Sequence, residues 1–201
     1  MTIRRLLIGS NNPGKHTEIG EALAGLSLEL IKPSDIDIQT DPDENGSSFA
    51  ENAIMKARHF RLASDGLPTL ADDSGIIVEA LKNELGISTR RWGAGPKATD
   101  DQWIDFFLRR MEKEKNKRAR FVCCIAYIDA QGKEYTFEGT CDGVITQSLE
   151  AGYLPGLPIS ACFKPKGFDC VYSAMSIEQK NSTSHRGRAL KKLRMQLLKT
   201  S

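Results

Sequence analysis

The sequence predicts an α/β fold, in which strands and helices are mixed along one chain. Three observations support this class: apolar runs of strand length recur, helical periodicity and capping signals lie between them, and there is no internal repeat. A length of 201 residues is enough for one good core, or for two small lobes that share one. Because no linker divides the chain, we expect residues 1–201 to form a single domain.

The first part of the chain predicts two short strands, a helix and a long loop. Asn12 is a good N-cap, and Pro13 fits the first position of the helix that follows. The loop is rich in Pro, Asp, Asn and Gly, and loops of this length inside a compact domain are often functional. We expect a strand at 3–9, a helix at 13–24, a strand at 28–31 and the loop at 32–47.

Capping boxes begin the next two helices, one at Ser48 and one at Thr99. In the first helix, Asn52 and Lys56 are four residues apart and therefore share a face. The second helix carries an apolar stripe of Trp103, Ile104, Phe107, Leu108 and Met111. Between the helices we expect strands at 67–71 and 76–80 around a bend at 72–75, followed by a Gly-rich connection at 83–98.

The last part of the chain predicts a hairpin, an irregular segment and a final helix. Residues 121–128 are nearly all apolar, whereas the returning strand alternates and has one wet face. Ser184 caps the final helix, whose leucines at 190, 193 and 197 face inward. The hairpin comprises 121–128, a turn at 129–132 and 133–146, and the irregular segment is 151–169.

Composition excludes several classes of protein. The net charge of +2 is too small to argue for nucleic-acid binding on its own. The five cysteines are odd in number and form no CxxC pair, so the sequence signals neither a disulfide framework nor a zinc site, and reduced thiols fit a cytoplasmic location. The longest apolar run, 121–128, is far too short to span a membrane.

The most informative segment is Leu70-Ala71-Asp72-Asp73-Ser74-Gly75, where two adjacent carboxylates follow an apolar strand. Charged groups are costly to bury unless they are paired or bind a metal. The pair therefore suggests a hard cation, typically Mg²⁺, which prefers oxygen ligands. The alternative is an ordinary turn, since Asp, Ser and Gly are common turn residues.

Two further segments suggest binding of an anion. Residues 10–15 join a strand to a helix N-terminus, where free N–H groups and the helix dipole favour a phosphate, and Lys15 adds a charge. His185 and Arg186 begin the final helix, where cations are unfavourable unless an anion lies between them and the helix end, and Lys180 lies nearby. The alternatives are an ordinary strand-to-helix turn and a solvated first turn.

Two loops complete the set of candidates. Lys166-Gly167-Phe168-Asp169 could stack an aromatic ring on a base and accept its N–H groups, although it could equally be a loop with one buried aromatic residue. The acidic segment 41–45 could supply a metal carboxylate, or it could only be solvated. Together these features are what a magnesium-dependent enzyme acting on a nucleoside triphosphate requires.

From residue 10 to about residue 198 the chain resembles the Ham1-like inosine triphosphate pyrophosphatase family, which clears ITP, dITP and XTP. The most specific matching segments are Glu51-Asn-Ala-Ile-Met-Lys56-Ala-Arg58, Ala71-Asp-Asp-Ser-Gly75, Ala98-Thr-Asp100 and Ser184-His-Arg-Gly-Arg-Ala189. The resemblance implies an elongated fold of two lobes with a central mixed β-sheet flanked by helices, a nucleotide cleft between the lobes, and a homodimer.

The resemblance also assigns roles to residues. Asp73 would be the catalytic carboxylate and a Mg²⁺ ligand with Asp72 beside it as a helper, and Glu44 would be the second metal carboxylate. Ser74 would touch the substrate, and Lys56 would face the phosphates. The triphosphate would be held by Ser10, Asn11, Asn12, Pro13, Gly14 and Lys15. The base and sugar would be surrounded by Lys166, Gly167, Phe168, Asp169, Lys180, His185 and Arg186.

Two loops depart from the family pattern. Ser10-Asn11-Asn12 replaces Thr-Gly-Asn, and Lys166-Gly167-Phe168-Asp169-Cys170 replaces Phe-Gly-Tyr-Asp-Pro. The expected reaction is hydrolysis of noncanonical purine NTPs to the monophosphate and pyrophosphate, with Mg²⁺ as cofactor and without a nucleic-acid or membrane partner. The alternatives are a related pyrophosphatase with another NTP preference and a noncatalytic nucleotide- or RNA-binding protein.

Overall fold

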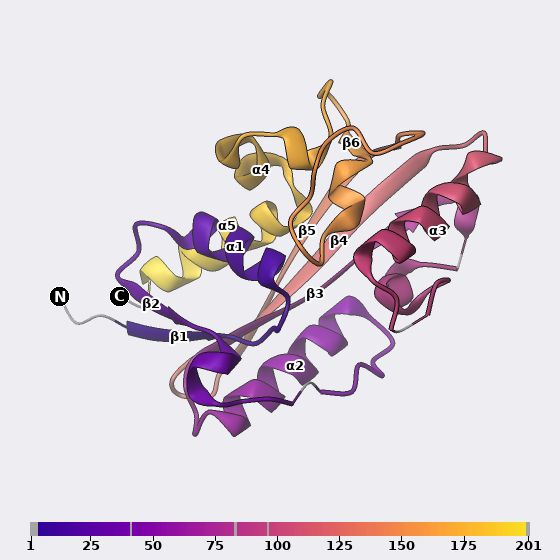
Figure 1. Cartoon of the computed structure of the whole chain (residues 1–201). Coiled ribbons are helices and arrows are strands. Elements are labelled where there is room, and N and C mark those ends of the chain that lie inside the picture. The colour runs from indigo at the N-terminus through magenta and orange to yellow at the C-terminus, as the bar shows by residue number, and fades with distance from the viewer. Residues whose placement is uncertain (1–3, 41, 83, 96, 200–201) are drawn as a thin grey trace.

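A six-stranded mixed sheet forms the centre of the computed structural model, which describes residues 4–40, 42–82, 84–95 and 97–199. The strand order is β2-β1-β3-β4-β5-β6; β1 is parallel to β2 and β3, and the remaining pairs are antiparallel. Long strands β3, β4 and β5 extend across the molecule (Figure 1). The strands are β1 (Arg4–Ile8), β2 (Leu28–Ile31), β3 (Thr69–Val78), β4 (Arg118–Ile128), β5 (Glu134–Ile145) and β6 (Phe163–Pro165).

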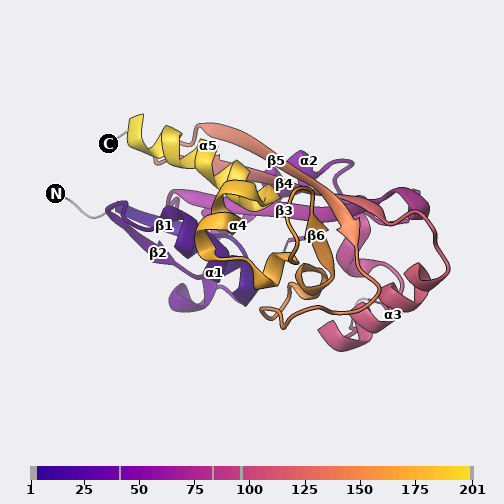
Figure 2. The same ribbon diagram turned by 90° about the horizontal axis from the view of Figure 1, so that it is seen from above.

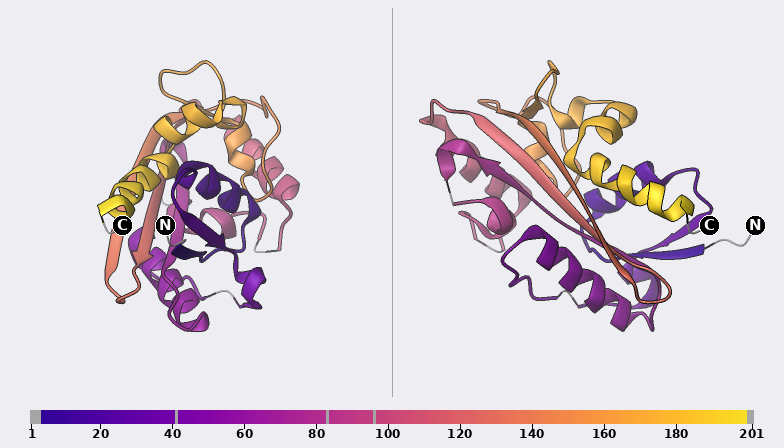
Figure 3. Two further views of the ribbon diagram at one scale, coloured as in Figure 1. Left: turned by 90° about the vertical axis from the view of Figure 1, so that its left-hand side faces the viewer. Right: turned by 180° about the vertical axis from the view of Figure 1, so that it is seen from behind.

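Helices cover both faces of the sheet. On one face, α1 (Pro13–Leu23) and α5 (His185–Lys199) bury leucines and isoleucines against β1 and β4, with α4 (Ile177–Thr183) beside them. On the other face, α2 (Phe49–Ala63) packs small alanines closely against β3 and β4. Figure 3 shows α2 and α5 on opposite sides of the β4–β5 hairpin.

The helix α3 (Asp100–Glu112) packs its aromatic stripe against the far ends of the long strands. Seen from above, α3 lies at one end of the molecule, and α1 and α5 lie toward the other (Figure 2). The structure therefore confirms the predicted α/β class with helices flanking a mixed sheet. No helix within the described ranges has the length and apolar character needed to cross a membrane.

The strand β3 corrects the predicted bend at 72–75. It is continuous over ten residues and pairs with β4 from Thr69 opposite Ile128 to Val78 opposite Ala119. The turn propensity of Asp, Ser and Gly is outweighed by this unbroken ladder of cross-strand pairs. Gly75 is required in the strand for a different reason: a Cβ there would overlap the carbonyl oxygen of Gly86, which approaches from the 3₁₀ turn Gly86–Arg91.

The helix starts were predicted correctly. Each predicted N-cap side chain accepts a hydrogen bond from the backbone N–H three residues later; these residues are Asn12, Ser48, Thr99 and Ser184. The elements missed are α4, the short β6 inside the segment expected to be irregular, and the 3₁₀ turns Pro33–Ile36, Glu79–Leu81, Gly86–Arg91, Pro158–Ala161 and Tyr172–Ala174. These short elements depend on tertiary contacts more than on local periodicity.

The sheet has an open edge that positions the site. The strand β1 pairs with only the first two residues of β3, Thr69 and Leu70, and the chain then leaves through residues 9–12 into α1. Among the described strands, none pairs with this edge of β3 beyond Leu70. The edge of β3 at residues 72–75 is therefore not covered by a neighbouring strand in the part of the chain that the structure describes.

Candidate active site

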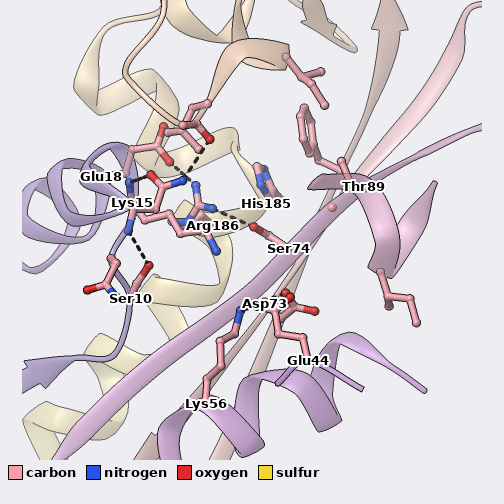
Figure 4. Close-up of a pocket in the computed structure, with 18 of the residues that line it drawn as sticks. Ser10, Lys15, Glu18, Glu44, Lys56, Asp73, Ser74, Thr89, His185 and Arg186 are labelled. Atoms are coloured by element: carbon pink, nitrogen blue, oxygen red, sulfur yellow. Dashed lines mark hydrogen bonds and ion pairs between the residues drawn. The ribbon is translucent and has the colours of Figure 1, made fainter. Parts of the chain in front are cut away.

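A pocket of about 790 Å³ lies at the open edge of β3. Its size is within the range of small-molecule sites. Its walls come from the start of α1, residues 42–45, α2, residues 73–75 of β3, residues 156–160 and residues 184–186 at the start of α5. Figure 4 shows Lys15, Glu18 and Arg186 on one side of β3, and Asp73, Lys56 and Glu44 on the other.

The two adjacent carboxylates face opposite sides of the sheet. Side chains alternate along a continuous strand, so consecutive residues cannot share a face. Asp72 accordingly contacts Lys15 of α1 and Arg186 of α5, whereas Asp73 contacts Asn52 and Lys56 of α2. The pair therefore consists of two groups in different environments, which have to be considered separately.

Asp72 is fully buried and paired with two cations. Its Oδ1 lies 3.0 Å from the Lys15 ammonium, and its Oδ2 accepts from Arg186 Nη2 at 3.1 Å and Nε at 3.3 Å. Burial alone would raise the pKa of Asp72, but Lys15 and Arg186 outweigh it and hold that pKa well below its usual value. Asp72 does not line the pocket. Its placement supports a role in holding the two cations and does not support the predicted role in helping catalysis.

Asp73 lines the pocket and has a less favourable environment for its charge. Its Oδ2 accepts from Asn52 Nδ2 at 3.1 Å, and its Oδ1 lies 3.2 Å from the Lys56 ammonium. Burial, reinforced by the nearby charge of Glu44, raises the pKa of Asp73 despite the opposing effect of Lys56. A buried carboxylate with a raised pKa in a pocket is a typical proton acceptor or metal ligand.

Lys56 joins the two carboxylates that were predicted to bind a metal. Its ammonium lies 2.6 Å from Glu44 Oε1 and 3.2 Å from Asp73 Oδ1, so the two acidic groups meet at one cation. Although burial lowers the pKa of Lys56, the charges of Asp73, Asp72 and Glu44 together raise it. Asp41, in the predicted acidic segment 41–45, lies outside the described residues.

Asn52 is a functional candidate that the sequence analysis did not single out. It is completely buried and holds Asp73 through Nδ2, while its Oδ1 accepts from the N–H of Gly46 at 2.8 Å. It therefore fixes the position of both the carboxylate and the acidic loop. The feature of the sequence that could have indicated this role is its spacing of four residues from Lys56, which places both residues on one face of α2.

The predicted phosphate loop is in the pocket, but its N–H groups are engaged. Ser10, Asn11, Asn12 and Lys15 line the pocket, whereas Pro13 and Gly14 do not. The N–H of Gly14 donates to Pro155 O at 3.1 Å, and that of Lys15 donates to Asn12 Oδ1 at 3.0 Å. The prediction of free N–H groups at these two positions is wrong, because the N-cap and the neighbouring chain use them. The side chains of the loop and the helix dipole remain for a phosphate.

The cations at the start of α5 are compensated within the protein. Arg186 is 2% exposed and donates to Asp72, Glu18 and Ser74, the last at 2.9 Å. Glu18 also lies 3.1 Å from the Lys180 ammonium, so this carboxylate, which sequence reasoning missed, joins α1 to α4 and α5. The anion inferred from this cationic helix start is thus supplied by Glu18 and Asp72. Lys180 does not line the pocket.

Aromatic rings form another part of the pocket. The rings of Phe121 and His185 are stacked with centroids 4.5 Å apart, and Tyr172 is stacked with both. Burial lowers the pKa of His185 well below its usual value, so this ring is neutral. Phe121 lies three residues from Cys124, the β4 partner of Asp73, so the two positions are about 10 Å apart along the sheet, and because that separation is odd their side chains point to opposite faces.

Comparison with known proteins is consistent with this architecture. The model of the Ham1 family matches residues 6–196. The chain belongs to the Ham1 family. A dITP/XTP pyrophosphatase of Leptospira interrogans is 36% identical over 98% of both chains, and one of Thermus thermophilus is 35% identical over 94% of this chain and 89% of its own. The solved Ham1 protein of Staphylococcus aureus superposes with a TM-score of 0.80 at 30% identity, covering 98% of this chain and all of the other.

In this Ham1 chain the pocket wall is not made of the loop that was expected to hold the base. Residues 166–169 do not line the pocket. Phe168 packs against the hydrophobic cluster that contains Trp103 and Phe163, and Lys166, Gly167 and Asp169 are exposed. The wall is instead Gly156-Leu157-Pro158-Ile159-Ser160, which contains neither an aromatic nor an acidic residue. The first departure from the family pattern does not strain the backbone, since Asn11 is not among the described residues with positive φ.

The donor set of the Ham1 pocket fits a hard cation. Two carboxylates, Asp73 and Glu44, meet at the Lys56 ammonium, and the raised pKa of Asp73 shows that its charge is incompletely compensated. No cluster of three or more acidic, His or Cys ligands is found in the described parts of the chain. The protein would therefore supply two oxygens, and substrate phosphates would supply others, as is typical of Mg²⁺ sites.

Proposed function

We propose that this Ham1 protein is a magnesium-dependent pyrophosphatase that hydrolyses noncanonical purine NTPs, namely ITP, dITP and XTP, to the monophosphate and pyrophosphate. One observation carries the proposal: a single pocket is lined both by the Asp73 and Glu44 carboxylates with their neighbouring cations and by the stacked rings of Phe121, Tyr172 and His185. The first part suits a triphosphate and its metal, and the second suits a flat base. The names of the relatives, dITP/XTP pyrophosphatases, agree with this substrate class.

Asp73 is placed to accept a proton from the attacking water or to orient it. Its raised pKa makes it a better base than an ordinary carboxylate at neutral pH, and Asn52 fixes its orientation. Bound Mg²⁺, held by Asp73 and Glu44, would supply Lewis-acid stabilisation of the phosphate oxygens. Lys56 would then turn from the carboxylates to the phosphates and neutralise the charge that develops on them.

On the other face of β3, Lys15 faces the pocket with its ammonium fixed by Asp72. It would hold the triphosphate beside Ser10, Asn11 and Asn12. Ser74 accepts a hydrogen bond from Arg186 and lies between Arg186 and Asp73 (Figure 4). For the base, donors that meet a 6-keto oxygen would be left unpaired against the amino group of adenine, which costs about 1–3 kcal/mol each.

A substrate panel with Mg²⁺ tests the proposed substrate class. We expect ITP, dITP and XTP to be hydrolysed faster than ATP or the pyrimidine NTPs, and Asp73→Asn to remove the activity toward all of them. A preference for ATP or for a pyrimidine NTP would contradict the purine selectivity while leaving the reaction in place. An Asp73→Asn variant with full activity would contradict the catalytic assignment.

The assembly and location are also proposals. We propose a homodimer in the cytoplasm, on the basis of the family resemblance and of five cysteines that are all free. Light scattering of the purified protein would give the oligomeric state, and a monomer at micromolar concentration would contradict the dimer. The RNA-binding alternative gains no support from α5, because three of its basic side chains, Arg188, Lys192 and Arg194, donate to backbone carbonyls.

A further inference from the structure

The motif Ala98-Thr99-Asp100 has no role in the pocket described above. Thr99 is the N-cap of α3, and Asp100 is the first residue of that helix and does not line the pocket. The Asp100 carboxylate nevertheless reaches the pocket wall indirectly: its Oδ2 accepts from the N–H of Gly156 at 2.5 Å. Gly156 is itself a lining residue.

Gly156 makes a second hydrogen bond on its other side. Its carbonyl oxygen accepts from Asn12 Nδ2 at 3.1 Å, so one residue joins Asp100 of α3 to the N-cap of α1. The geometry requires glycine, because φ is +80° and a Cβ would overlap the Asn12 amide. This contact depends on a close approach that no other residue type permits.

Neighbouring contacts reinforce the connection. We call residues 153–157 the strap, because they join the two ends of the pocket rim. Tyr153 donates to Asp101 of α3, and Pro155 O accepts from the N–H of Gly14 in α1 at 3.1 Å. In Figures 1 and 2 this orange segment lies between α1 and α3. The strap is thus attached to α3 at one end and to the start of α1 at the other.

The strap acts on the phosphate loop through Asn12. The same Asn12 side chain that donates to Gly156 also accepts from the N–H of Lys15 at 3.0 Å. Lys15 carries the ammonium that faces the pocket. We propose that Asp100 is a positioning residue, which fixes the strap and thereby holds Asn12 and the phosphate-binding segment 10–15 in its binding geometry.

An alternative role for Asp100 is purely local, since an acidic residue in the first turn of a helix stabilises the dipole. The Asp100→Asn variant separates the two roles, because the amide oxygen can still accept from Gly156 while the charge is lost. Asp100→Ala removes both. Asp105→Ala is the matched control, since Asp105 is an exposed carboxylate of the same helix that pairs with Arg109 and does not contact the strap.

The first readout is hydrogen exchange of the backbone amides of residues 153, 154, 156 and 157, which does not depend on activity. We expect Asp100→Ala to accelerate exchange of these amides by about tenfold or more, whereas Asp100→Asn and Asp105→Ala stay within about threefold of the unmutated protein. Unchanged exchange in Asp100→Ala would overturn the proposal. Equal acceleration in Asn and Ala variants would assign Asp100 to the helix dipole alone and would also overturn it.

The second readout is calorimetric binding of tripolyphosphate with Mg²⁺, and it rests on the proposed function. We expect Asp100→Ala to weaken binding by about tenfold, and Asn12→Ala by at least as much because Asn12 also lines the pocket. In the Asn12→Ala background, Asp100→Ala should have little further effect, because Asp100 is connected to the phosphate loop through Gly156 and Asn12. Effects that multiply to about a hundredfold would overturn the coupling. If the unmutated protein binds no tripolyphosphate, the proposed phosphate site fails, and the exchange data alone decide whether Asp100 holds the strap.

Discussion

Replacing Asp72 by asparagine should destabilise the fold, whereas replacing Asp73 by asparagine should not, although the two residues are neighbours on one strand. Asp72 lies 3.0 Å from Lys15 and 3.1 Å from Arg186, with no exposure of its side chain. With an effective dielectric constant of 20, each such pair amounts to about 5 kcal/mol of attraction, part of which is offset by desolvation. Removing one partner of a buried pair typically costs about 3–5 kcal/mol, because the other charge stays buried.

We therefore expect Asp72→Asn to lower the free energy of unfolding by about 3–5 kcal/mol at pH 7. For a chain of this size that corresponds to a decrease in Tm of roughly 6–20 °C. Asp73→Asn should leave stability unchanged or increase it in the absence of metal, since the raised pKa shows that the fold disfavours this charge. Although Asp73→Asn should not destabilise the fold, it should lower the hydrolytic activity by about 10²-fold or more.

The assay is urea unfolding of both variants at pH 7 with EDTA present, followed by the same variants at pH 3. Because the pKa of Asp72 is lowered, its contribution is present above the usual aspartate pKa near 4 and lost as the pH falls below it. The difference between Asp72→Asn and the unmutated protein should therefore decrease at pH 3. Equal destabilisation by both substitutions at pH 7 would refute the assignment of the carboxylates to different environments.

Three further predictions concern pH, metal and packing. The pKa of His185 is lowered in the fold, whereas the unfolded imidazole titrates near 6.5, so the free energy of unfolding should fall from pH 7 to pH 5. In urea unfolding, His185→Phe should reduce this dependence of the midpoint on pH. Equal pH dependence in the variant and the unmutated protein would contradict the prediction. Mg²⁺ at a hundredfold excess over its Kd should stabilise the protein by about 2.7 kcal/mol in thermal unfolding, and Glu44→Gln should diminish that shift; an undiminished shift would place the metal elsewhere. In urea unfolding, Gly139→Ala should destabilise the protein by about 1–3 kcal/mol, because a Cβ there overlaps the His185 carbonyl. Gly20→Ala should stabilise it by about 1 kcal/mol, because Gly20 lies in α1 and faces open space. A change of the same sign in both variants would contradict the packing argument.

Local signals in the sequence predicted the elements well. The N-caps Asn12, Ser48, Thr99 and Ser184 all form the expected hydrogen bonds, because capping involves residues only three apart. The same local reasoning failed at residues 72–75. There the turn propensity of individual residues competes with pairing to β4, a strand some 50 positions away, and a single sequence does not reveal that pairing.

The site was predicted in part, for a similar reason. Glu44, Lys56 and Asp73 were expected to act together, and the structure brings them into contact. Phe121 and Tyr172, which form the aromatic wall, carry no sequence signal that distinguishes them from core residues. Likewise the wall 156–160 could not be distinguished from 166–169, because only the position of the strap against α1 and α3 decides which loop reaches the pocket.

The reaction proposed for the pocket at the edge of β3 is cleavage between the α and β phosphates of a purine triphosphate. The most direct test is to identify the products of ITP with Mg²⁺ by separating nucleotides and assaying pyrophosphate and orthophosphate in parallel. We expect inosine monophosphate and pyrophosphate in equal amounts, and no release of either by Asp73→Asn. Inosine diphosphate with orthophosphate, or no turnover of ITP, would contradict the proposed reaction.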